Sequence, residues 1–319
     1  MGVAEVLSGR LADGELVIID GGMGSQLQAE GVPMDHLAWS ARANLEQPEV
    51  VQRVHEAYIR AGAEVIIANT FAASRAGLQP AGLGGRVAEA NRSAVRAAQA
   101  ARDAAATRPV AVAGSMSSFC PIAMAPADLG APPGDPAGAD PRFPSLAHFR
   151  EQAGLLAEAG ADLIVLEMID ARGYGRAALQ AAAETGLPVW LGISPGRRDD
   201  GTLGTFPELG DGDSFEDLLR ALVSPGLAAV SVMHASPDVM PDAIEIIRGH
   251  FAGPIGVYAE TGGWQPPNWV FDGLTPGDYL RHAKTWADRG AQIIGGCCGT
   301  GPEHIQALTD GLTRRPAAR

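Results

Sequence analysis

The chain lacks the features that define several classes of protein. It has only three cysteines in 319 residues, and two of them, Cys297 and Cys298, are adjacent. Three cysteines placed in this way cannot form the disulfide framework of a small secreted protein. Because the chain needs no oxidising compartment, we expect it to reside in the reducing cytoplasm.

Basic residues are also scarce. Lys and Arg together number 24 against 37 Asp and Glu, which gives a formal net charge of −13. A nucleic-acid-binding surface needs clustered basic side chains, and so does attraction to anionic lipid. No run approaches the roughly 18 apolar residues that a membrane-spanning helix requires. The first residues also lack the basic segment and long apolar core of a signal peptide. We therefore expect neither a nucleic-acid partner nor membrane association.

The sequence does contain a series of short apolar runs. They are nearly unbroken, as is typical of strands that are buried on both faces. The eight runs are 16–20, 64–69, 110–114, 162–167, 188–193, 229–233, 254–258 and 292–296. The segments between them include three that predict helices, at 48–61, 86–106 and 145–159.

Eight strands that alternate with helices predict the α/β class and a single (β/α)8 TIM barrel, forming one domain over residues 1–319. The alternative is an open doubly wound sheet. It is disfavoured because no G-x-G-x-x-G turn follows the first strand. The stretch 116–144 follows the third strand, is rich in Pro, Gly, Ala and Asp, and shows no periodicity. We expect it to lie over the C-terminal mouth of the barrel.

Catalytic residues of a (β/α)8 barrel lie where its strands end. Cys297 and Cys298 follow the eighth run within a Gly-Gly-Cys-Cys-Gly phrase, whose flexible backbone could turn both thiolates toward one Zn²⁺. The alternative is two buried cysteines that pack as small hydrophobic side chains. His234 ends the sixth run and could supply a third ligand, or it could be a hydrogen-bonded histidine without a metal. Cys120, in the loop after the third strand, is a less favoured alternative ligand.

Four further polar residues end expected strands: Asp20, Asn69, Thr70 and Glu167. The two carboxylates could bind a substrate ammonium group or move protons. Turn formation is an alternative explanation for Asp20, and a salt bridge to Arg172 or Arg176 is one for Glu167. The other two residues could bind polar groups of a substrate or cap the following helix.

Four phrases stand out in order along the chain. They are Asp20-Gly-Gly-Met-Gly-Ser-Gln-Leu27, Gly62-Ala-Glu-Val-Ile-Ile-Ala-Asn-Thr-Phe71, Glu167-Met-Ile and Gly295-Gly-Cys-Cys-Gly-Thr-Gly-Pro-Glu-His-Ile305. Together they resemble the homocysteine S-methyltransferase family, which includes S-methylmethionine-dependent and betaine-dependent enzymes. The resemblance extends from about residue 16 to residue 308.

This resemblance implies a (β/α)8 barrel in which three cysteines hold Zn²⁺ and homocysteine supplies the fourth ligand through its sulfur. Zinc lowers the pKa of the thiol, so that a thiolate exists at neutral pH. The thiolate then attacks a methyl group on a sulfonium, an ammonium or a folate nitrogen. The family's strand-end glutamate, which helps to hold the homocysteine amino group, matches Glu167, and its opening aspartate matches Asp20.

The sequence departs from the family pattern at two of the expected strand ends. The family's first zinc cysteine lies in a Gly-x-Asn-Cys phrase, where this chain has Met233 and His234 in place of Asn and Cys. The family's Pro-Asn-x-Gly phrase is here Ala-Glu-Thr-Gly, which introduces Glu260. Two thiolates and one neutral imidazole leave a Zn²⁺ site with no net charge, whereas three thiolates give −1. We expect Glu260 to add an acid close to a cationic substrate group.

We therefore predict a zinc-dependent S-methyltransferase that moves a methyl group from a small onium donor, S-methylmethionine or S-adenosylmethionine, to a thiol such as homocysteine, giving methionine. The expected zinc ligands are His234, Cys297 and Cys298, and the expected substrate-binding residues are Asp20, Asn69, Thr70, Glu167 and Glu260, with Asp20 and Glu167 in catalytic roles. The alternatives are a diverged zinc barrel enzyme that acts on a different thiol or onium substrate, and an inactive homologue that binds a metal or ligand. The sequence leaves the oligomeric state open.

Overall fold

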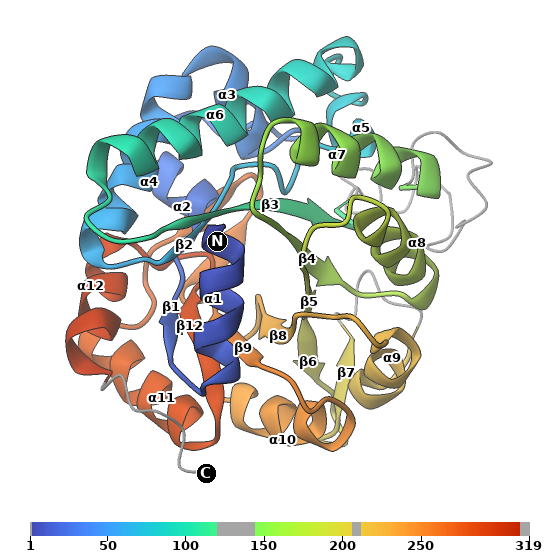
Figure 1. Ribbon diagram of the computed structural model, residues 1–319, viewed down its shortest axis with the longest axis vertical. Coiled ribbons are helices and arrows are strands. Elements are labelled where there is room, and N and C mark those ends of the chain that lie inside the picture. Colours follow the sequence, from blue (N-terminus) through green and yellow to red (C-terminus); the bar gives the residue numbers. More distant parts are fainter. Residues whose placement is uncertain (1, 120–143, 206–211, 313–319) are drawn as a thin grey trace.

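The computed structural model describes residues 2–119, 144–205 and 212–312. At its centre lies a sheet of eight parallel strands in the order β1-β12-β9-β8-β5-β4-β3-β2. A parallel bridge between Ile19 and Val65 brings β1 alongside β2, so that the sheet closes on itself. Figure 1 shows the helices arranged around this barrel. The expected (β/α)8 fold is confirmed.

The barrel strands coincide with the apolar runs of the sequence, since each strand overlaps one run. They are β1 (Val17–Ile18), β2 (Val65–Ile67), β3 (Ala111–Ser117), β4 (Leu163–Ile169), β5 (Val189–Ile193), β8 (Ala229–Met233), β9 (Ile255–Ala259) and β12 (Ala291–Gly296). Two short antiparallel hairpins, which the sequence did not predict, follow the ends of β5 and β9. They are β6 (Pro195–Arg197) with β7 (Leu203–Thr205), and β10 (Gly263–Gln265) with β11 (Asn268–Val270).

The helices of the described residues occupy most of the intervening chain. They are α1 (Val3–Ala12), α2 (Met23–Ala29), α3 (Ala43–Glu46), α4 (Pro48–Ala61), α5 (Arg75–Leu78), α6 (Val87–Ala105), α7 (Leu146–Glu158), α8 (Arg172–Ala183), α9 (Phe215–Leu222), α10 (Met240–His250), α11 (Pro276–Asp288) and α12 (Pro302–Gly311), with short 3₁₀ turns η1 (Ser40–Arg42) and η2 (Gly84–Arg86). The three expected helices correspond to α4, α6 and α7. None of the helices described is long and apolar enough to cross a membrane.

Three helices reach the following strand through the same Gly-Ala joint in the sequence. Gly62, Gly160 and Gly290 end α4, α7 and α11 with φ values of +116°, +89° and +90°. An L-residue with a side chain rarely adopts this left-handed conformation, and glycine adopts it without steric cost. The repeated phrase therefore predicts where a helix stops and the chain turns into the barrel.

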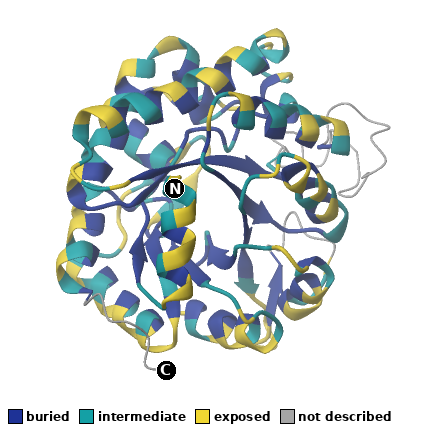
Figure 2. Ribbon diagram, viewed as in Figure 1, coloured by how far each residue is buried: buried dark blue, intermediate teal, exposed yellow. Residues whose placement is uncertain are grey.

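The strands are apolar on both faces because the barrel has two separate cores. Along β4, Leu163 and Val165 point into the barrel interior, whereas Ile164 and Leu166 join the layer between the strands and the helices. Successive side chains of a strand alternate between its faces, so a strand covered on both sides needs a continuous apolar run. Figure 2 shows the barrel strands largely buried, while many exposed residues lie on the outer faces of the helices and in the loops.

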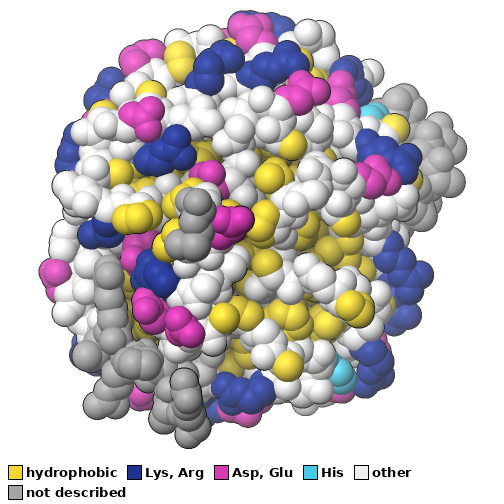
Figure 3. Space-filling model, in the orientation of Figure 1, with side chains coloured by type: hydrophobic (Ala, Val, Ile, Leu, Met, Phe, Trp, Pro, Cys, Tyr) yellow, Lys and Arg dark blue, Asp and Glu magenta, His cyan; other side chains and the backbone are white. Residues whose placement is uncertain are grey.

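Helix α1 covers the N-terminal end of the barrel. Leu7 and Leu11 are buried in the same cluster as the interior side chains of the strands, and Figure 1 shows α1 lying across the opening. A hollow of about 160 Å³ remains beside it, lined mainly by apolar side chains that include Leu163 and Trp190, and apolar side chains gather on this face in Figure 3. The strand ends that bear polar side chains therefore lie at the opposite, C-terminal end.

Candidate metal centre and active site

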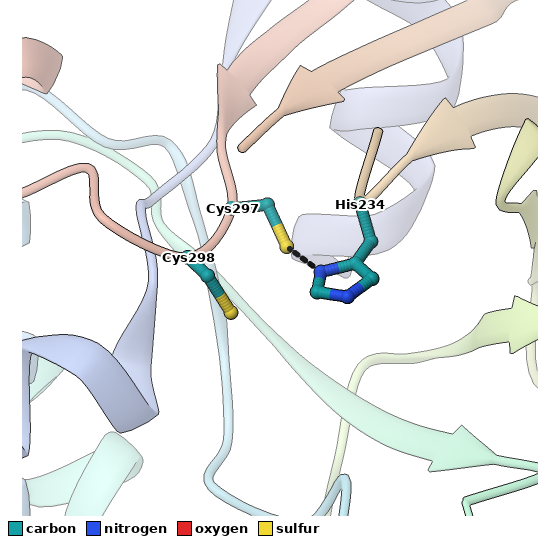
Figure 4. Close-up of side chains that lie close together, drawn as sticks. All are labelled: His234, Cys297 and Cys298. Carbon is teal, nitrogen blue, oxygen red and sulfur yellow. Dashed lines mark hydrogen bonds between the residues drawn. The ribbon is translucent and has the colours of Figure 1, made fainter. Parts of the chain in front are cut away.

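The three candidate ligands converge at the C-terminal mouth of the barrel. His234 directly follows β8, and Cys297 and Cys298 directly follow β12. One ligand atom from each residue lies within 4.8 Å of the other two. The Nδ1 atom of His234 is 3.6 Å from the Sγ atom of Cys297, and Figure 4 shows the three side chains gathered around one space.

This spacing fits a tetrahedral metal ion. A Zn²⁺-sized ion lies about 2.3 Å from sulfur and about 2.0–2.1 Å from nitrogen, which places two such ligand atoms about 3.6 Å apart. The observed distance between Nδ1 of His234 and Sγ of Cys297 has this value. The donor set, two sulfurs and one imidazole nitrogen, is also one that such an ion prefers. The residues present could therefore hold a metal ion.

The backbone after β12 bends sharply enough to turn both cysteines toward this space. The Cys297 amide donates to the Ala259 carbonyl at 2.9 Å, which continues the pairing with β9, while the Thr300 hydroxyl donates to the Cys297 carbonyl at 2.6 Å. Gly299 follows with φ +79°, and a Cβ atom there would lie 1.7 Å from the Thr261 carbonyl oxygen. Only glycine fits this turn, which explains the Gly after the two cysteines.

His234 itself has a left-handed backbone, with φ +44°. This conformation is unfavourable for a residue with a side chain and is concentrated at functional sites. The preceding Met233 is buried in the barrel interior, where its sulfur accepts a hydrogen bond from Ser194 Oγ at 3.1 Å. The turn at His234 therefore allows two successive side chains to face the barrel axis rather than opposite sides of the strand.

The charges of the cluster favour a bound cation. The neighbouring Cys298 thiol and burial raise the pKa of Cys297 well above its usual value, because two thiolates side by side repel each other. Burial alone would lower the pKa of His234, but Cys297, Glu260 and Glu167 outweigh it and raise that pKa to about 9. A divalent ion would replace these protons and neutralise the thiolates.

Glu167 and Asp20 are both buried carboxyl groups close to the cluster. Glu167, near the end of β4, is 8 % exposed and accepts a hydrogen bond from the Ser115 hydroxyl. Burial raises its pKa to about 7, against the opposing effects of Ser115 and His234. The Oδ2 atom of Asp20 accepts from the Ile67 amide at 2.7 Å, whereas its buried Oδ1 atom has no hydrogen-bond partner among the described residues.

Burial, and to a lesser degree repulsion from Glu167, also raise the pKa of Asp20. Two buried acids that repel each other gain stability from a cationic group placed between them or beside them. The alternative salt bridge of Glu167 does not form with Arg172, whose guanidinium pairs with Asp213.

Asn69 and Thr70 use their side chains within the protein. The Asn69 amide donates to the Asn44 Oδ1 atom and to the Ser40 carbonyl, each at 2.9 Å, and its oxygen accepts from the Ser40 hydroxyl at 2.8 Å. Thr70 is fully buried, and its hydroxyl exchanges hydrogen bonds with the Ser115 backbone. Neither residue caps the next helix, because Ser74 caps α5. These contacts favour a supporting role for both residues, and direct substrate binding by them stays a prediction.

A rim of aromatic side chains, Trp39, Phe71, Trp264 and Trp269, extends from the candidate metal centre. The His234 and Trp269 rings have centroids 6.2 Å apart, and Trp264 lies 6.3 Å from Trp269 and 6.1 Å from Trp39. Trp39 meets Phe71 edge-on at 6.1 Å. Trp264 is 38 % exposed, whereas Trp269 is buried. The rim therefore presents aromatic surface at the mouth.

Sequence reasoning did not find this rim. The one available signal was a pair of tryptophans, Trp264 and Trp269, that lie five residues apart and come shortly after the seventh expected strand. The whole chain has only five tryptophans. Cys120, the alternative ligand, lies outside the described residues, as does most of the stretch 116–144. Its part in metal binding stays a prediction.

Comparisons with known proteins identify the family. The model of the family described as "Homocysteine S-methyltransferase" matches residues 17–312. The chain is 32 % identical to Homocysteine S-methyltransferase 1 of Zea mays, over 99 % of each sequence, and 26 % identical to the selenocysteine methyltransferase of Astragalus bisulcatus, over 92 % of each. The metallated form of the homocysteine methyltransferase MmuM from Escherichia coli superposes with a TM-score of 0.71 at 26 % identity, covering 92 % of this chain and 96 % of that one.

Proposed function

The chain belongs to the homocysteine S-methyltransferase family and is a methyltransferase, and from this premise we propose that it methylates homocysteine at a zinc centre formed by His234, Cys297 and Cys298. The observation that carries the proposal is the convergence of these three ligand atoms within 4.8 Å at the barrel mouth. The solved structure of the relative MmuM is a metallated form, which supports a metal in this family. The preference for zinc follows from the two thiolates and one imidazole.

Zinc, when bound, would supply the positive charge that keeps the acceptor sulfur as a thiolate at neutral pH. Three protein ligands leave one position for that sulfur, which is typical of a catalytic rather than a structural site. We propose that Glu167 and Asp20 bind the ammonium group of the acceptor, because both are buried acids that accept hydrogen bonds from neutral groups, the Ser115 hydroxyl and the Ile67 amide. The bond to zinc and the contacts of the ammonium group with these two acids would together hold the acceptor thiolate in line with the methyl group of the donor.

For the methyl donor we propose a small onium compound, S-methylmethionine or S-adenosylmethionine. The aromatic rim offers ring faces that attract a positively charged sulfonium. The acids at the mouth add to this attraction, and the chain as a whole carries a net charge of −13. Transfer of the methyl group neutralises the sulfonium, so the rim would bind the donor more strongly than the demethylated product.

The proposal is tested by an assay of zinc-loaded protein against a panel of methyl acceptors and onium donors. Homocysteine, cysteine and selenocysteine should be compared, because one relative is named a selenocysteine methyltransferase. Methionine should form from homocysteine. The double variant Cys297→Ser, Cys298→Ser should fold, because serine has nearly the size and shape of cysteine, but should lose both zinc and activity. Stoichiometric zinc in the double variant would refute the proposed ligands, and activity without any metal would refute the zinc mechanism.

A further inference from the structure

The backbone of Met168, directly after Glu167, is bonded to two side chains from other strand ends. The pairing of β4 with β5 shifts register at this point, and Met168 has φ +51°. Its amide donates to the Sδ atom of Met233 at 3.3 Å, and its carbonyl accepts from the Ser118 hydroxyl at 2.7 Å. These two contacts hold a backbone conformation that is unfavourable for a residue with a side chain.

The side chain of Met233 reaches β4 across the strand that lies between them. Met233 ends β8, and β5 separates β8 from β4 in the sheet. On β5, a Cβ atom at Gly192 would lie 2.7 Å from the Leu166 carbonyl oxygen and 3.2 Å from Cγ of Met233. The glycine therefore leaves the room that the methionine needs to approach the Met168 amide.

The sulfur of Met233 accepts two hydrogen bonds in a place closed to solvent. Besides the Met168 amide, the Ser194 hydroxyl donates to it at 3.1 Å, and both Ser194 and Met233 are buried. A thioether is only a weak acceptor, and a methionine in a core usually contributes packing alone. Here the sulfur serves a buried amide and a buried hydroxyl, each of which would be costly without an acceptor. The contact thus stabilises the turn at Met168.

This turn determines where the Glu167 carboxylate lies. Glu167 pairs with Ser117 of β3 as the last residue of β4 in that register, and its carboxylate accepts from the Ser115 hydroxyl. The chain then turns at Met168, so the position of Glu167 depends on the anchor of the residue after it. Charge-assisted hydrogen bonds to an ammonium group require a well-placed carboxylate.

We propose that Met233 is a positioning residue, whose sulfur holds the turn at Met168 and thereby directs the Glu167 carboxylate toward the ammonium group of the acceptor. This inference rests on the proposed function in one respect, namely that Glu167 binds that ammonium group. Met233 stands where the family phrase has asparagine, and the two residues share one property. Asparagine carries an oxygen on Cγ, at the place where methionine carries its sulfur, so each offers an acceptor to the Met168 amide.

Hydrogen exchange at the Met168 amide tests the contact without reference to activity. The chain has eight methionines, so labelling them with ¹⁵N gives few amide signals, and the signal lost in Met168→Leu is that of Met168. Leucine at position 233 has a methyl group where methionine has its sulfur. We therefore expect exchange at the Met168 amide to be about tenfold faster, or more, in Met233→Leu than in the wild-type protein. Met233→Asn, which keeps an acceptor, should retain most of the protection.

Steady-state kinetics of the zinc-loaded variants test the consequence for Glu167. Met233→Leu should raise the KM for homocysteine about tenfold, the effect of a buried donor left without its acceptor. The kcat and the zinc content should not change, because the lost interaction contributes to binding of the acceptor and not to transfer of the methyl group. Met233→Asn should keep the KM within about threefold of the wild-type value, since its oxygen restores the hydrogen bond.

Met116→Leu is the matched control. It makes the same replacement at another fully buried methionine, which packs in the layer between the strands and the helices. Its KM for homocysteine, kcat and zinc content should equal those of the wild-type protein. An equal rise in KM in Met116→Leu and Met233→Leu would show a general effect of packing and would overturn the inference.

The double variant Met233→Leu, Glu167→Gln shows whether Met233 acts through Glu167. In the Glu167→Gln background no charge remains to be directed, so adding Met233→Leu should change the affinity for homocysteine by less than about twofold. If the effects of the two substitutions multiply instead, Met233 acts independently of Glu167 and the inference is overturned.

The outcomes separate this inference from the proposed function. Unchanged exchange at the Met168 amide in Met233→Leu, or an equal rise in KM in Met233→Leu and Met233→Asn, would overturn the role of the sulfur and leave the proposed function standing. Loss of zinc from Met233→Leu would overturn it as well, because the residue would then act through His234. Unchanged affinity for homocysteine in Glu167→Gln would refute the proposed role of Glu167, and the inference with it.

Discussion

Two residues at the mouth of the barrel, Met168 and His234, have side chains and yet adopt positive φ values of 51° and 44°. Each directly follows a residue that faces the barrel interior, Glu167 or Met233. A left-handed residue at a strand end breaks the alternation of side chains, so that neighbours along the chain face the same side. The shift of register between Leu166 and Ile169 marks the same irregularity in β4. Such strain is a common property of active sites in rigid barrels.

Glu167→Gln should weaken binding of the acceptor and leave the zinc content unchanged. The amide keeps the size of the side chain but loses the charge that pairs with an ammonium group, and charge-assisted hydrogen bonds are the strong ones. We expect a loss on the order of 2–4 kcal/mol, as for one partner of a desolvated charged pair. Calorimetric titration of the zinc-loaded variant with homocysteine measures this loss. Unchanged affinity, or loss of metal, would contradict the assigned role.

The raised pKa of Glu167 also predicts how stability depends on pH. In the unfolded chain this carboxyl ionises near its ordinary value of 4.5, whereas in the folded protein burial raises its pKa to about 7. Between these pH values the folded state keeps a proton that the unfolded state has lost. The stabilising contribution is therefore complete below pH 4.5 and lost as the pH rises through about 7.

Urea unfolding of the metal-free protein tests this prediction. Relative to Glu167→Gln, the wild-type protein should lose on the order of 3 kcal/mol of unfolding free energy between pH 5 and pH 8. The variant is itself the control, because the other titrating groups are common to both proteins. A difference between the two proteins that does not change with pH would show that Glu167 titrates normally in the folded state.

The convergence of the candidate metal ligands could be predicted from the sequence because they are strand-end residues in short, characteristic phrases. His234, Cys297 and Cys298 each follow an apolar run, and the parallel strands bring those ends together. The contact between Glu260 and His234 could not be predicted at this level, because it depends on side-chain directions after two irregular turns. Asn69 illustrates the opposite case, since its strand-end position suggests a substrate contact, whereas its side chain bonds to Ser40 and Asn44.

At the scale of elements, the hairpin of β10 and β11 carries two tryptophans of the aromatic rim, Trp264 and Trp269. The Trp269 backbone exchanges two hydrogen bonds with the Gln28 side chain of α2, at 2.6 and 2.9 Å, and the Trp269 indole donates to the Thr261 carbonyl at 2.8 Å. These contacts fix the hairpin to the barrel. Trp264, on the facing strand, is left partly exposed beside Trp39. The hairpin therefore presents an aromatic surface at a fixed position.

Trp264→Ala should raise the KM for the onium donor by about 3- to 30-fold, the effect expected from losing one cation–π contact. The KM for homocysteine and the zinc content should not change, because the ring of Trp264 lies beside Trp39 and Trp269, and it is Trp269 that lies beside His234. Steady-state kinetics with each substrate varied in turn provide the measurement. Trp264→Phe, which keeps an aromatic face, should retain most of the donor affinity.

Phe271→Ala is the matched control for this variant. Phe271 follows β11 directly and is 52 % exposed, so its removal changes a similar area of apolar surface outside the aromatic rim. Its kinetics should equal those of the wild-type protein. Equal effects of the two substitutions on donor KM would show that the rim does not recognise the donor.

The elements of the barrel were easier to predict than those of the mouth. Strands buried on both faces need unbroken apolar runs, and these runs are visible in the sequence without knowledge of the fold. The strands of the two hairpins have only three residues each, and Gly263–Gln265 is neither apolar nor alternating. Such short strands form because the fixed ends of β5 and β9 bring their residues together, and no local pattern encodes that.

At the scale of the whole molecule, the two ends of the barrel differ in the side chains that they carry. The candidate metal centre lies at the C-terminal ends of the strands, whereas α1 covers the N-terminal ends with apolar side chains. Gln292 at the start of β12 donates to the Leu11 carbonyl at 2.7 Å, and Arg10 pairs with the buried Glu64 before β2 at 2.9 Å. Helix α1 is thus fastened to the strands. That residues 1–319 form one domain stays a prediction.

Leu11→Ala should reduce the stability of the protein without affecting its metal centre. Leu11 is 5 % exposed and packs against the interior side chains of the barrel. Truncating a buried leucine removes its hydrophobic contacts and leaves a cavity, for which we expect a loss of about 2–4 kcal/mol in unfolding free energy.

In a (β/α)8 barrel the N-terminal end contributes stability and the C-terminal end contributes activity. Zinc affinity and methyl transfer, measured well below the unfolding temperature, should therefore match the wild-type values. Ser8→Ala, a change on the exposed side of the same helix, should alter neither property. A loss of zinc affinity in Leu11→Ala would show that the two ends of the barrel are coupled.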